Sequence, residues 1–501
     1  MSRLSLINTR AQTGLRAPLV QVEVHISQGL PALSMVGLAT AAVKESKDRV
    51  RSAIINSGFV FPASRITVNL APADLPKNGG RFDLPIALGI LLASGQLSVE
   101  NINKYEFIGE LALSGELRPV SGILPAAVAC RKRQKTLCIP QDNAETAALM
   151  HNGNIISASD LLSVCNHLAG ASILDTVTPS DSQVSLVSYP DLADVQGQHQ
   201  AKKALTIAAA GGHHLLFLGP PGTGKTMLAS RLPGIMPPLN SEEALDVASL
   251  YSLTHACHPL PWRQRPFRAP HHSSSSVALV GGGSQPKPGE ISYAHFGVLF
   301  LDELPEFQRQ ALDMLREPLE EGSITITRAN AREIYPACFQ LVAAMNPCQC
   351  GYLGDSQRAC RCTPDQVSRY RNKVSGPLMD RIDLQVEVVR PKPEWLLSKA
   401  KQHLVTASDI RQQVEECRCR QIERQGKNNA ALNTNDIHQY CALTHSDKSF
   451  FTLLCEKKQW SARAIHKVLR VARTIADLDK SESVQKNHLA EAVHYRKFDA
   501  P

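Results

Sequence analysis

The segment that most constrains this chain is a glycine-rich turn between an apolar run and a second hydrophobic stretch. The turn reads Gly219-Pro220-Pro221-Gly222-Thr223-Gly224-Lys225-Thr226. Leu215–Leu218 before it predicts a buried parallel strand, and the residues from Met227 onward predict a helix. This spacing is that of a Walker A phosphate loop, in which backbone N–H groups and a helix N-terminus face phosphate oxygens. We expect Lys225 to reach the β- and γ-phosphates and the Thr226 hydroxyl to bind Mg²⁺.

A second apolar run supplies the acidic half of such a site. Val298–Leu301 predicts another buried strand, and Asp302 and Glu303 follow it directly. Ligands of open parallel sheets bind at the carboxyl ends of the strands, where these carboxylates would lie. Asp302 suits Mg²⁺ held through water, and Glu303 suits orientation and deprotonation of an attacking water. Together the two motifs predict an ATPase.

Composition limits the class of protein. The chain has 501 residues, enough for about two to four domains in an α/β multidomain fold. Hydrophobic residues make up 43% and the mean hydropathy is −0.15, with no apolar run long enough to cross a bilayer. The first five residues lack the apolar region of a signal peptide, so we expect a cytoplasmic protein without a membrane partner. Thirteen cysteines disfavour a disulfide framework, and a net charge of +8 permits a polyanionic partner.

Residues 1–170 predict an α+β domain without a phosphate loop. Strands are expected at 20–26 and 65–70, helices at 41–57 and 84–94, and a hairpin beginning at Phe107. This region resembles the Lon-protease-like (S5 domain 2-like) domain at the N-terminus of ComM/YifB-type magnesium-chelatase-like proteins. The matching stretches are residues 37–39, 70–77, 82–88 and 109–120.

The same comparison implies an inactive protease domain. Where Lon proteases carry their serine and lysine, this chain has Arg81-Phe82-Asp83 and Ile123-Leu124-Pro125. A serine–lysine mechanism therefore lacks both of its groups. We expect the domain to serve ring assembly or nucleic-acid contact, with a purely structural role as the alternative.

The rest of the chain divides into a linker, a core and a helical end. Residues 171–190 have linker composition, and residues 391–501 have helical periodicity. Between them, residues 191–390 resemble an AAA+ parallel αβα core. Asp194-Val195-Gln196-Gly197-Gln198 resembles the AAA+ segment that precedes the phosphate loop, and a helix is expected at 202–210. The resemblance implies that residues 391–501 form a helical lid.

Two basic segments resemble insertions of the magnesium-chelatase branch. Residues 233–295 are too long a connection to be needed for a nucleotide site, and carry Arg263, Arg265 and Arg268. Residues 266–273 and 288–292 resemble the branch's helix-2 insert, which faces the ring pore. Strands are expected at 323–327 and 339–344, with Arg328, Asn330 and Arg332 at the tip between them, as in the hairpin before sensor 1. His255, Cys257 and His258 fit no standard tetrahedral metal spacing, so no site is assigned there.

Three polar residues match AAA+ positions that act on the γ-phosphate. Asn346 ends a predicted strand and fits sensor 1, where an amide holds the attacking water. The resemblance implies that Arg381 reaches the neighbouring subunit's γ-phosphate, an arrangement worth about 10³–10⁵ in rate. The alternative for Arg381 is a surface ion pair with Asp380 or Asp383. Arg463 matches sensor 2 in the lid.

Four cysteines gather in residues 348–362. Cys348 and Cys350 form one close pair, and Cys360 and Cys362 form another. Two such pairs in a reducing compartment predict a Cys₄ zinc site, although each pair is tighter than usual. Four reduced thiols are the alternative.

The resemblance covers essentially the whole chain and implies a homo-hexameric AAA+ DNA helicase that uses ATP and Mg²⁺. Its implied activity is branch migration during integration of transforming DNA, with single-stranded and branched DNA and other recombination proteins as partners. One alternative is a chelatase-type remodeller that inserts metal into a cofactor or protein. The other is a Lon-like protease, which the missing serine and lysine disfavour.

Overall fold

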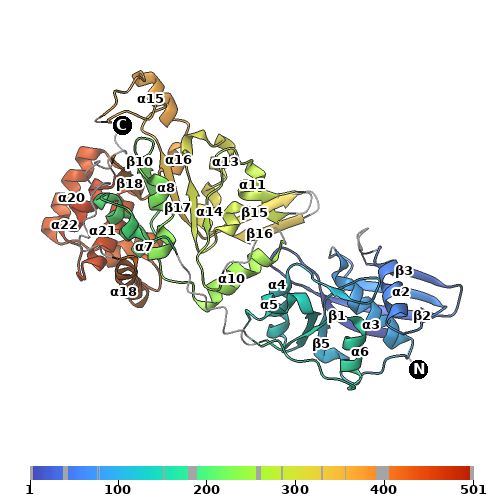
Figure 1. Cartoon of the computed structure of the whole chain (residues 1–501). Coiled ribbons are helices and arrows are strands. Elements are labelled where there is room, and N and C mark those ends of the chain that lie inside the picture. The colour runs from blue at the N-terminus through green and yellow to red at the C-terminus, as the bar shows by residue number, and fades with distance from the viewer. Residues whose placement is uncertain are drawn as a thin grey trace. The chain divides into compact units, whose positions relative to one another are not determined.

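The computed structural model divides the chain into two compact units, Met1–Ser185 with Ser241–Trp262, and Leu186–Asn240 with Arg263–Pro501 (Figure 1). It describes residues 4–37, 43, 45–75, 77, 79–150, 153–178, 189–254, 261–283, 286–328, 331–355, 357–390 and 406–496. The division cuts across the expected core of residues 191–390. Helix α10 (Ser241–Ser252) lies between the two phosphate-site strands in sequence but belongs to the first unit, where the Gly122 N–H donates to the Ser252 carbonyl at 2.7 Å.

The first unit contains a four-stranded sheet in the order β1-β2-β4-β3. Its strands are β1 (Leu4–Arg10), β2 (Leu19–Ser27), β4 (Arg65–Ala71) and β3 (Ala32–Val36). The first three are antiparallel, and β3 runs parallel to β4. Alternate residues of β2 and β4 are buried against α2 (Ser46–Asn56) and α3 (Asp83–Ala93), as the period-two pattern predicts.

A second, parallel sheet completes this unit. Strands β5 (Tyr105–Phe107), β8 (Thr136–Pro140) and β9 (Ile155–Ala158) form it, with helices α4 (Ile123–Lys132), α5 (Ala144–Ala147) and α6 (Leu161–Leu168). The predicted hairpin forms later than expected. Phe107 belongs to the parallel sheet, and the hairpin itself pairs β6 (Glu110–Leu111) with β7 (Leu117–Arg118).

The residues at the protease-like positions make structural contacts. Arg81 is buried and donates through Nη2 to the Ser121 carbonyl at 2.6 Å. Asp83 is fully buried and accepts from Arg49 Nε at 2.8 Å, while burial raises the pKa of its carboxyl to about 6. Both side chains therefore hold the start of α3 in place.

The second unit is built on a five-stranded parallel sheet in the order β11-β14-β17-β10-β18. The strands are β11 (Phe267–Arg268), β14 (Val298–Leu301), β17 (Gln340–Met345), β10 (Leu215–Leu218) and β18 (Leu384–Glu387). Strands β10, β14 and β17 are buried along their whole length, which explains their continuous apolar runs.

Two expectations about connectivity are corrected by this sheet. Residues 233–295 are not simply an insertion, because Phe267–Arg268 forms the edge strand β11 beside β14. The basic hairpin is not made by residues 323–327 and 339–344. It pairs β15 (Ser323–Arg328) with β16 (Ala331–Pro336), and the following strand β17 enters the central sheet. In both cases the sequence analysis did not predict a strand, β11 or β16, because its composition does not distinguish it from a loop.

Helices from the end of the chain pack against this core. Helix α7 (His199–Gly211) contacts α18 (Ala407–Gln425) and α21 (Ala462–Leu478) in one hydrophobic cluster. The remaining helices there are α19 (Thr434–Tyr440), α20 (His445–Lys458) and α22 (Lys486–His494). Short helices complete the unit: α8 (Lys225–Ala229), α9 (Leu232–Ile235), α11 (Ser276–Val280), α12 (Glu290–Tyr293), α13 (Arg309–Asp313), α14 (Arg316–Glu321), α15 (Pro364–Arg371) and α16 (Gly376–Met379).

Candidate nucleotide-binding site

The polar residues predicted to act on a nucleotide lie at one edge of the central sheet. Leu218 of β10 pairs with Met345 of β17, and Leu301 of β14 pairs with Ala343 of the same strand. The three strands are parallel, so their carboxyl ends deliver residues 219–226, Asp302 and Asn346 to the same edge.

The glycine-rich turn depends on its glycines at specific points. Gly222 and Gly224 have φ values of 75° and 87°, in the left-handed region that other residues rarely adopt. Gly219 approaches the residue after β18 so closely that a Cβ atom would lie 2.1 Å from the Val388 carbonyl oxygen. The Thr223 hydroxyl donates to the Pro220 carbonyl at 3.0 Å and closes the turn. No side chain caps α8, so its first N–H groups are available to a phosphate.

Four of the predicted side chains form a cluster of two hydrogen-bonded pairs. Lys225 Nζ donates to Asn346 Oδ1 at 3.0 Å and to the carbonyls of Gly219 and Pro220 at 2.7 and 2.9 Å. Burial lowers the pKa of the Lys225 ammonium. The Thr226 hydroxyl donates to Asp302 Oδ2 at 2.6 Å. A hydroxyl and a carboxylate oxygen placed together are the donor set that Mg²⁺ prefers, so these residues fit that ion.

Glu303 lies beside this cluster in an uncommon backbone conformation. Its φ of 52° is left-handed, and its N–H donates to Asp302 Oδ1 at 2.9 Å. Its carboxylate Oε2 lies 3.1 Å from His272 Nδ1. Sequence reasoning missed His272, because its position depends on the unrecognised strand β11. Residues that follow β11 reach the same sheet edge as residues that follow β14.

The two predicted γ-phosphate arginines lie apart from the cluster. Arg381 follows α16, donates to the Pro377 carbonyl at 2.6 Å and forms an ion pair with Glu320 rather than with Asp380 or Asp383. Arg463 is exposed in the first turn of α21. Among the described residues, no hydrogen bond joins either arginine to Lys225 or Asp302. Their predicted roles would require a bound nucleotide or a neighbouring subunit.

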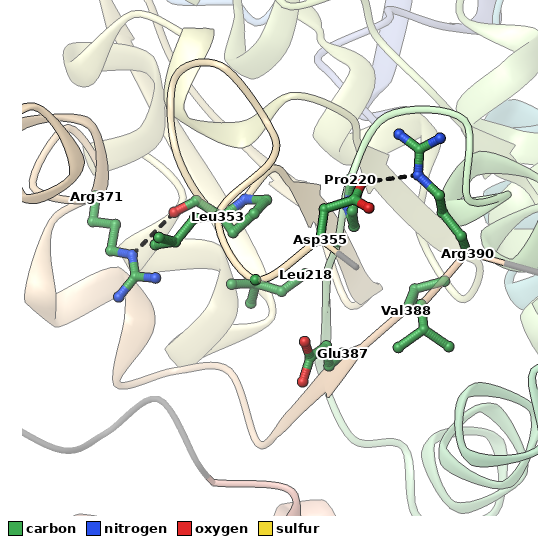
Figure 2. Close-up of a pocket in the computed structure, with 12 residues that line it drawn as sticks. Leu218, Pro220, Leu353, Asp355, Arg371, Glu387, Val388 and Arg390 are labelled. Carbon is green, nitrogen blue, oxygen red and sulfur yellow. Dashed lines mark hydrogen bonds and ion pairs between the residues drawn. The ribbon is translucent and has the colours of Figure 1, made fainter. Parts of the chain in front are cut away.

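A cavity of about 240 Å³ borders the start of the phosphate loop (Figure 2). One wall is Leu218, Gly219 and Pro220, and the opposite walls come from the ends of β17 and β18 and from the cysteine loop. In Figure 2, Arg390 Nε donates to Asp355 at 2.8 Å across this space. The cavity thus lies between the phosphate loop and the cysteine loop.

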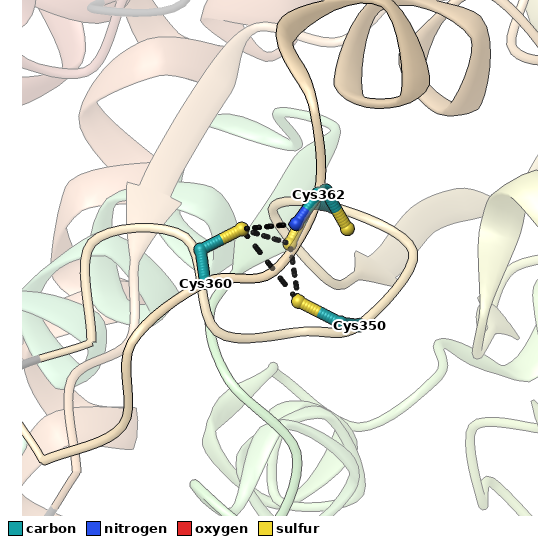
Figure 3. Close-up of side chains that lie close together, drawn as sticks. Cys350, Cys360 and Cys362 are labelled. Atoms are coloured by element: carbon teal, nitrogen blue, oxygen red, sulfur yellow. Dashed lines mark hydrogen bonds between the residues drawn. The ribbon is translucent and has the colours of Figure 1, made fainter.

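The four cysteines of residues 348–362 converge as the sequence predicted (Figure 3). Their sulfur atoms all lie within 4.8 Å of one another. Cys348 Sγ lies 3.4 Å from Cys350 Sγ and 3.6 Å from Cys360 Sγ. A zinc tetrahedron with Zn–S bonds of about 2.3 Å has S–S edges of about 3.8 Å, so the spacing fits this metal. Backbone N–H groups of Arg361 and Tyr352 lower the pKa of the Cys350 thiol, which favours a ligating thiolate.

This cysteine loop packs directly on the phosphate loop. A Cβ atom on Gly351 would lie 2.9 Å from Pro221 Cδ, and 3.8 Å from the amide carbon of Asn346. Gly351 has a φ of 84°, so the loop turns at the point of contact. The conformation of the cysteine loop therefore affects the positions of Pro221 and Asn346.

Comparison with known proteins identifies the family. Models of magnesium chelatase subunit ChlI match residues 22–143 and 191–396, and a model of its C-terminal part matches 405–496. The uncharacterized protein YifB of Escherichia coli K12 is 50% identical over 99% of this chain and 97% of its own length. The competence protein ComM of Haemophilus influenzae is 50% identical over 98% and 97%. Lon protease 2 of Bacillus subtilis is 27% identical over 27% of this chain and 26% of its own length.

The chain belongs to the ComM/YifB family of magnesium-chelatase-like proteins. Membership supports an AAA+ core and ATPase activity with ATP and Mg²⁺, in agreement with the mixed α/β architecture. Within the described part of this ComM/YifB-family chain, no helix is long and apolar enough to cross a membrane.

The arginines predicted to contact DNA occupy two kinds of environment in this family member. Arg328 and Arg332 are exposed near the tip of the β15–β16 hairpin. Arg265 is buried, and its guanidinium donates to the carbonyls of Pro237 and Phe296. Arg265 therefore supports the fold, and its predicted contact with a phosphate stays a prediction that this burial disfavours.

Arg263 and Arg268 also have partners within the unit. Arg268 donates to both carboxylate oxygens of Glu290 at 2.6 Å, and Arg263 Nε donates to the Leu239 carbonyl at 3.0 Å. Asn330 and the group His255, Cys257 and His258 lie outside the described residues. The hairpin arginines are thus the better placed for a polyanionic ligand.

Proposed function

We propose that this protein is an ATP-driven DNA helicase that promotes branch migration when transforming DNA is integrated by homologous recombination. The ATPase part of the proposal is carried by the cluster in which Lys225 meets Asn346 while Thr226 meets Asp302 at the carboxyl edge of the sheet. The DNA part is carried by the exposed Arg328 and Arg332 of the β15–β16 hairpin. The 50% identity to a competence protein over nearly the whole chain supports the biological setting.

Each polar residue at the carboxyl edge of the central sheet has a role in ATP hydrolysis. The N–H groups of residues 219–226 and the Lys225 ammonium hold the β- and γ-phosphates. Thr226 and Asp302 would hold Mg²⁺, which would neutralise phosphate charge. Asn346 orients a water, and Glu303 accepts its proton as the water oxygen attacks the γ-phosphorus. The bond to the β-phosphate oxygen breaks, giving ADP and inorganic phosphate.

Completion of this site requires an assembly. Arg381 and Arg463 form no hydrogen bond with the Lys225 cluster among the described residues, which fits a supply of positive charge from another subunit or on nucleotide binding. We assign Arg381 to the γ-phosphate of the adjacent subunit and Arg463 to the nucleotide of its own chain, within a homo-hexamer. Glu320 holds Arg381 in the absence of that partner.

We assign DNA binding to the β15–β16 hairpin. Arg328 and Arg332 are exposed close to the β15–β16 turn, where two strands project them together. Guanidinium groups bind phosphates without reading sequence, as a motor on single-stranded or branched DNA requires. Other recombination proteins would act on the same DNA.

We also propose that Cys348, Cys350, Cys360 and Cys362 hold one Zn²⁺. Their four sulfur atoms match the size of a tetrahedral thiolate site. Zinc would be structural there, since four protein ligands leave no open position for chemistry.

A magnesium-chelatase-type remodeller is the second candidate. The three family models that cover residues 22–143, 191–396 and 405–496 all carry that name. Such a protein would also hydrolyse ATP, so the site alone does not separate the two functions. The exposed arginines of the hairpin favour a polyanion over a cofactor.

The deciding experiment measures ATPase rate with and without single-stranded and forked DNA, together with strand displacement on a three-stranded branch-migration substrate. We expect DNA to stimulate hydrolysis and ATP to drive displacement. An active ATPase that ignores every DNA would reject the helicase and favour the remodeller. A Lys225→Ala variant controls for contaminating ATPases.

A further inference from the structure

The backbone that carries Arg381 is held by the C-terminal helices, a contact that the proposed mechanism does not use. Arg381 lies between α16 and β18, with Asp380 before it and Ile382 after it. The ammonium of Lys467, a residue of α21, donates to the carbonyls of both neighbours, at 3.3 Å to that of Ile382. The chain on either side of Arg381 is therefore tied to one side chain of α21.

Lys467 also forms an ion pair within this contact. Its Nζ lies 3.4 Å from Asp383 Oδ1, and the two side chains are only 11% and 9% exposed. The other carboxylate oxygen of Asp383 accepts from the N–H of His214, the residue before β10, at 3.1 Å. An ammonium has three N–H donors, and here it faces two carbonyls and one carboxylate. The charge and the donors of Lys467 thus match the acceptors around Arg381.

The end of α22 supports the same stretch of backbone. Arg496 donates through Nη1 to the Ile382 carbonyl at 3.1 Å. The Gln385 N–H of β18 donates to the Tyr495 carbonyl at 2.8 Å. Of these contacts, the one between Lys467 and the Asp380 carbonyl is adjacent to Arg381 in the chain. We therefore expect Lys467 to have the strongest influence on Arg381.

The Arg381 side chain is held by a partner that a phosphate can replace. Its guanidinium pairs with Glu320, which is 54% exposed, and donates to the Pro377 carbonyl at 2.6 Å. An ion pair with an exposed carboxylate contributes little stability, so a γ-phosphate of another subunit can take the place of Glu320. The direction in which Arg381 then extends depends on its backbone.

We propose that Lys467 is a positioning residue that fixes the backbone of Arg381, so that this arginine reaches the γ-phosphate in the neighbouring subunit. The inference rests on the proposed role of Arg381 and assigns the support of that residue to the C-terminal helices. Among the described residues, no hydrogen bond or ion pair joins Lys467 to Lys225 or Asp302. Loss of the Lys467 ammonium should therefore slow hydrolysis without weakening the binding of ATP.

Substitutions of Lys467 measure this support. Lys467→Met keeps the length of the side chain and removes its charge and donors, whereas Lys467→Arg keeps both. Lys457→Met makes the same chemical change at an exposed position of α20 and is the matched control. We expect Lys467→Met to lower kcat about 10²-fold, the effect of a misplacement of about 1 Å at a reacting group, with KM and the Kd for Mg-ATP unchanged. Lys467→Arg should recover most of this loss, and Lys457→Met should match the wild type.

A double-variant cycle shows whether Lys467 acts through Arg381. Lys467→Met combined with Arg381→Ala should be no slower than Arg381→Ala alone, because a positioning residue has no effect once the residue that it positions is gone. Two losses that multiply would overturn the inference, as would a wild-type kcat for Lys467→Met or a raised Kd for Mg-ATP in calorimetry. If Lys467→Met does not fold, Lys467→Gln, which keeps an amide donor, takes its place in the cycle.

Mixed assemblies separate this inference from the proposed function. Lys467→Met subunits keep a complete phosphate site, so mixing with Lys225→Ala subunits should restore their activity as far as it restores that of Arg381→Ala subunits. Rescue of Arg381→Ala without rescue of Lys467→Met would overturn the inference while the action of Arg381 in trans stands. Wild-type turnover by Arg381→Ala, or rescue of neither variant, would overturn the proposed role of Arg381 and this inference with it.

Discussion

Asp302 and Glu303 are adjacent in sequence, but the structure gives their carboxylates different partners. Asp302 accepts from the Thr226 hydroxyl, whereas Glu303 contacts His272. Because the Thr226–Asp302 pair does not involve the Glu303 side chain, and the Glu303 N–H that donates to Asp302 belongs to the backbone, replacement of this side chain should leave the binding of Mg-ATP largely intact.

Glu303→Gln should therefore bind ATP normally but hydrolyse it about 10²–10⁴-fold more slowly, the usual contribution of a general base. Equilibrium binding and steady-state turnover measure the two effects. Asp302→Asn is the contrasting variant, since it should weaken the Mg²⁺ dependence of binding itself. Turnover of Glu303→Gln close to wild type would remove Glu303 from the proton-transfer step.

Replacement of Arg381 tests whether hydrolysis depends on contact between neighbouring subunits. Within one chain its partly buried side chain pairs with the exposed Glu320. Arg381→Ala should bind ATP almost normally and hydrolyse it poorly. Mixed with Lys225→Ala subunits, it should regain part of its activity, because each variant supplies what the other lacks across an interface. Absence of rescue at every mixing ratio would argue against action in trans.

At the scale of elements, the cysteine loop and the phosphate loop share a contact at Gly351 and Pro221. Freshly prepared, reduced protein should contain one zinc per chain. A structural thiolate site binds with about 10–16 kcal/mol, so dialysis should not remove the metal. Metal analysis checks the stoichiometry. Well under one equivalent would favour four free thiols.

The C-terminal helices are joined by a buried polar centre. Asp477 is 2% exposed and accepts from Arg473 at 2.8 Å, Arg424 at 2.6 Å and Asn429 at 2.8 Å. Asp477→Ala would leave the buried Arg473 charge without this partner. We expect it to lower the free energy of unfolding by about 3–5 kcal/mol, measured by denaturant titration. The exposed Asp409→Ala is the control: it removes only the capping-box carboxylate that accepts from the Thr406 N–H at 2.9 Å, and should lower the free energy of unfolding much less. If both variants lower the free energy of unfolding equally, the buried polar centre contributes little to stability.

At the scale of the whole molecule, the hairpin should couple nucleotide and DNA. Each phosphate neutralised on single strands contributes about −0.7 to the slope of log affinity against log salt. Arg328→Ala with Arg332→Ala should flatten that slope and abolish DNA-stimulated ATPase, while basal ATPase persists.

Fluorescence anisotropy with random and homopolymer oligonucleotides measures affinity and its tolerance of sequence. Lys457→Ala with Lys458→Ala removes the same charge from α20 and serves as the control. If the hairpin variant keeps the wild-type salt slope and full stimulation of ATPase by DNA, the DNA contact lies elsewhere in the protein. That result would also favour the remodeller function.

Much of the nucleotide site was predictable because its chemistry is local. Gly222 and Gly224 adopt left-handed backbone conformations within one turn, and the apolar runs before Gly219 and Asp302 form buried strands. The position of Asn346 followed from the same pattern. The convergence of the four cysteines was predictable from spacing, since two close pairs joined by a short loop can meet.

The phosphate loop, the paired carboxylates and the family can be predicted from the amino-acid sequence, because each depends on residues that follow one another in the chain. Other features depend on contacts between distant segments. Arg265 is buried because Pro237 and Phe296 surround it, and α10 leaves the core for the first unit. His272 meets Glu303 because a two-residue strand pairs with β14. Such contacts join segments that are far apart in the sequence, and hydrophobic periodicity describes each segment only by itself. The positions of these residues therefore depend on packing and hydrogen bonding across the whole chain.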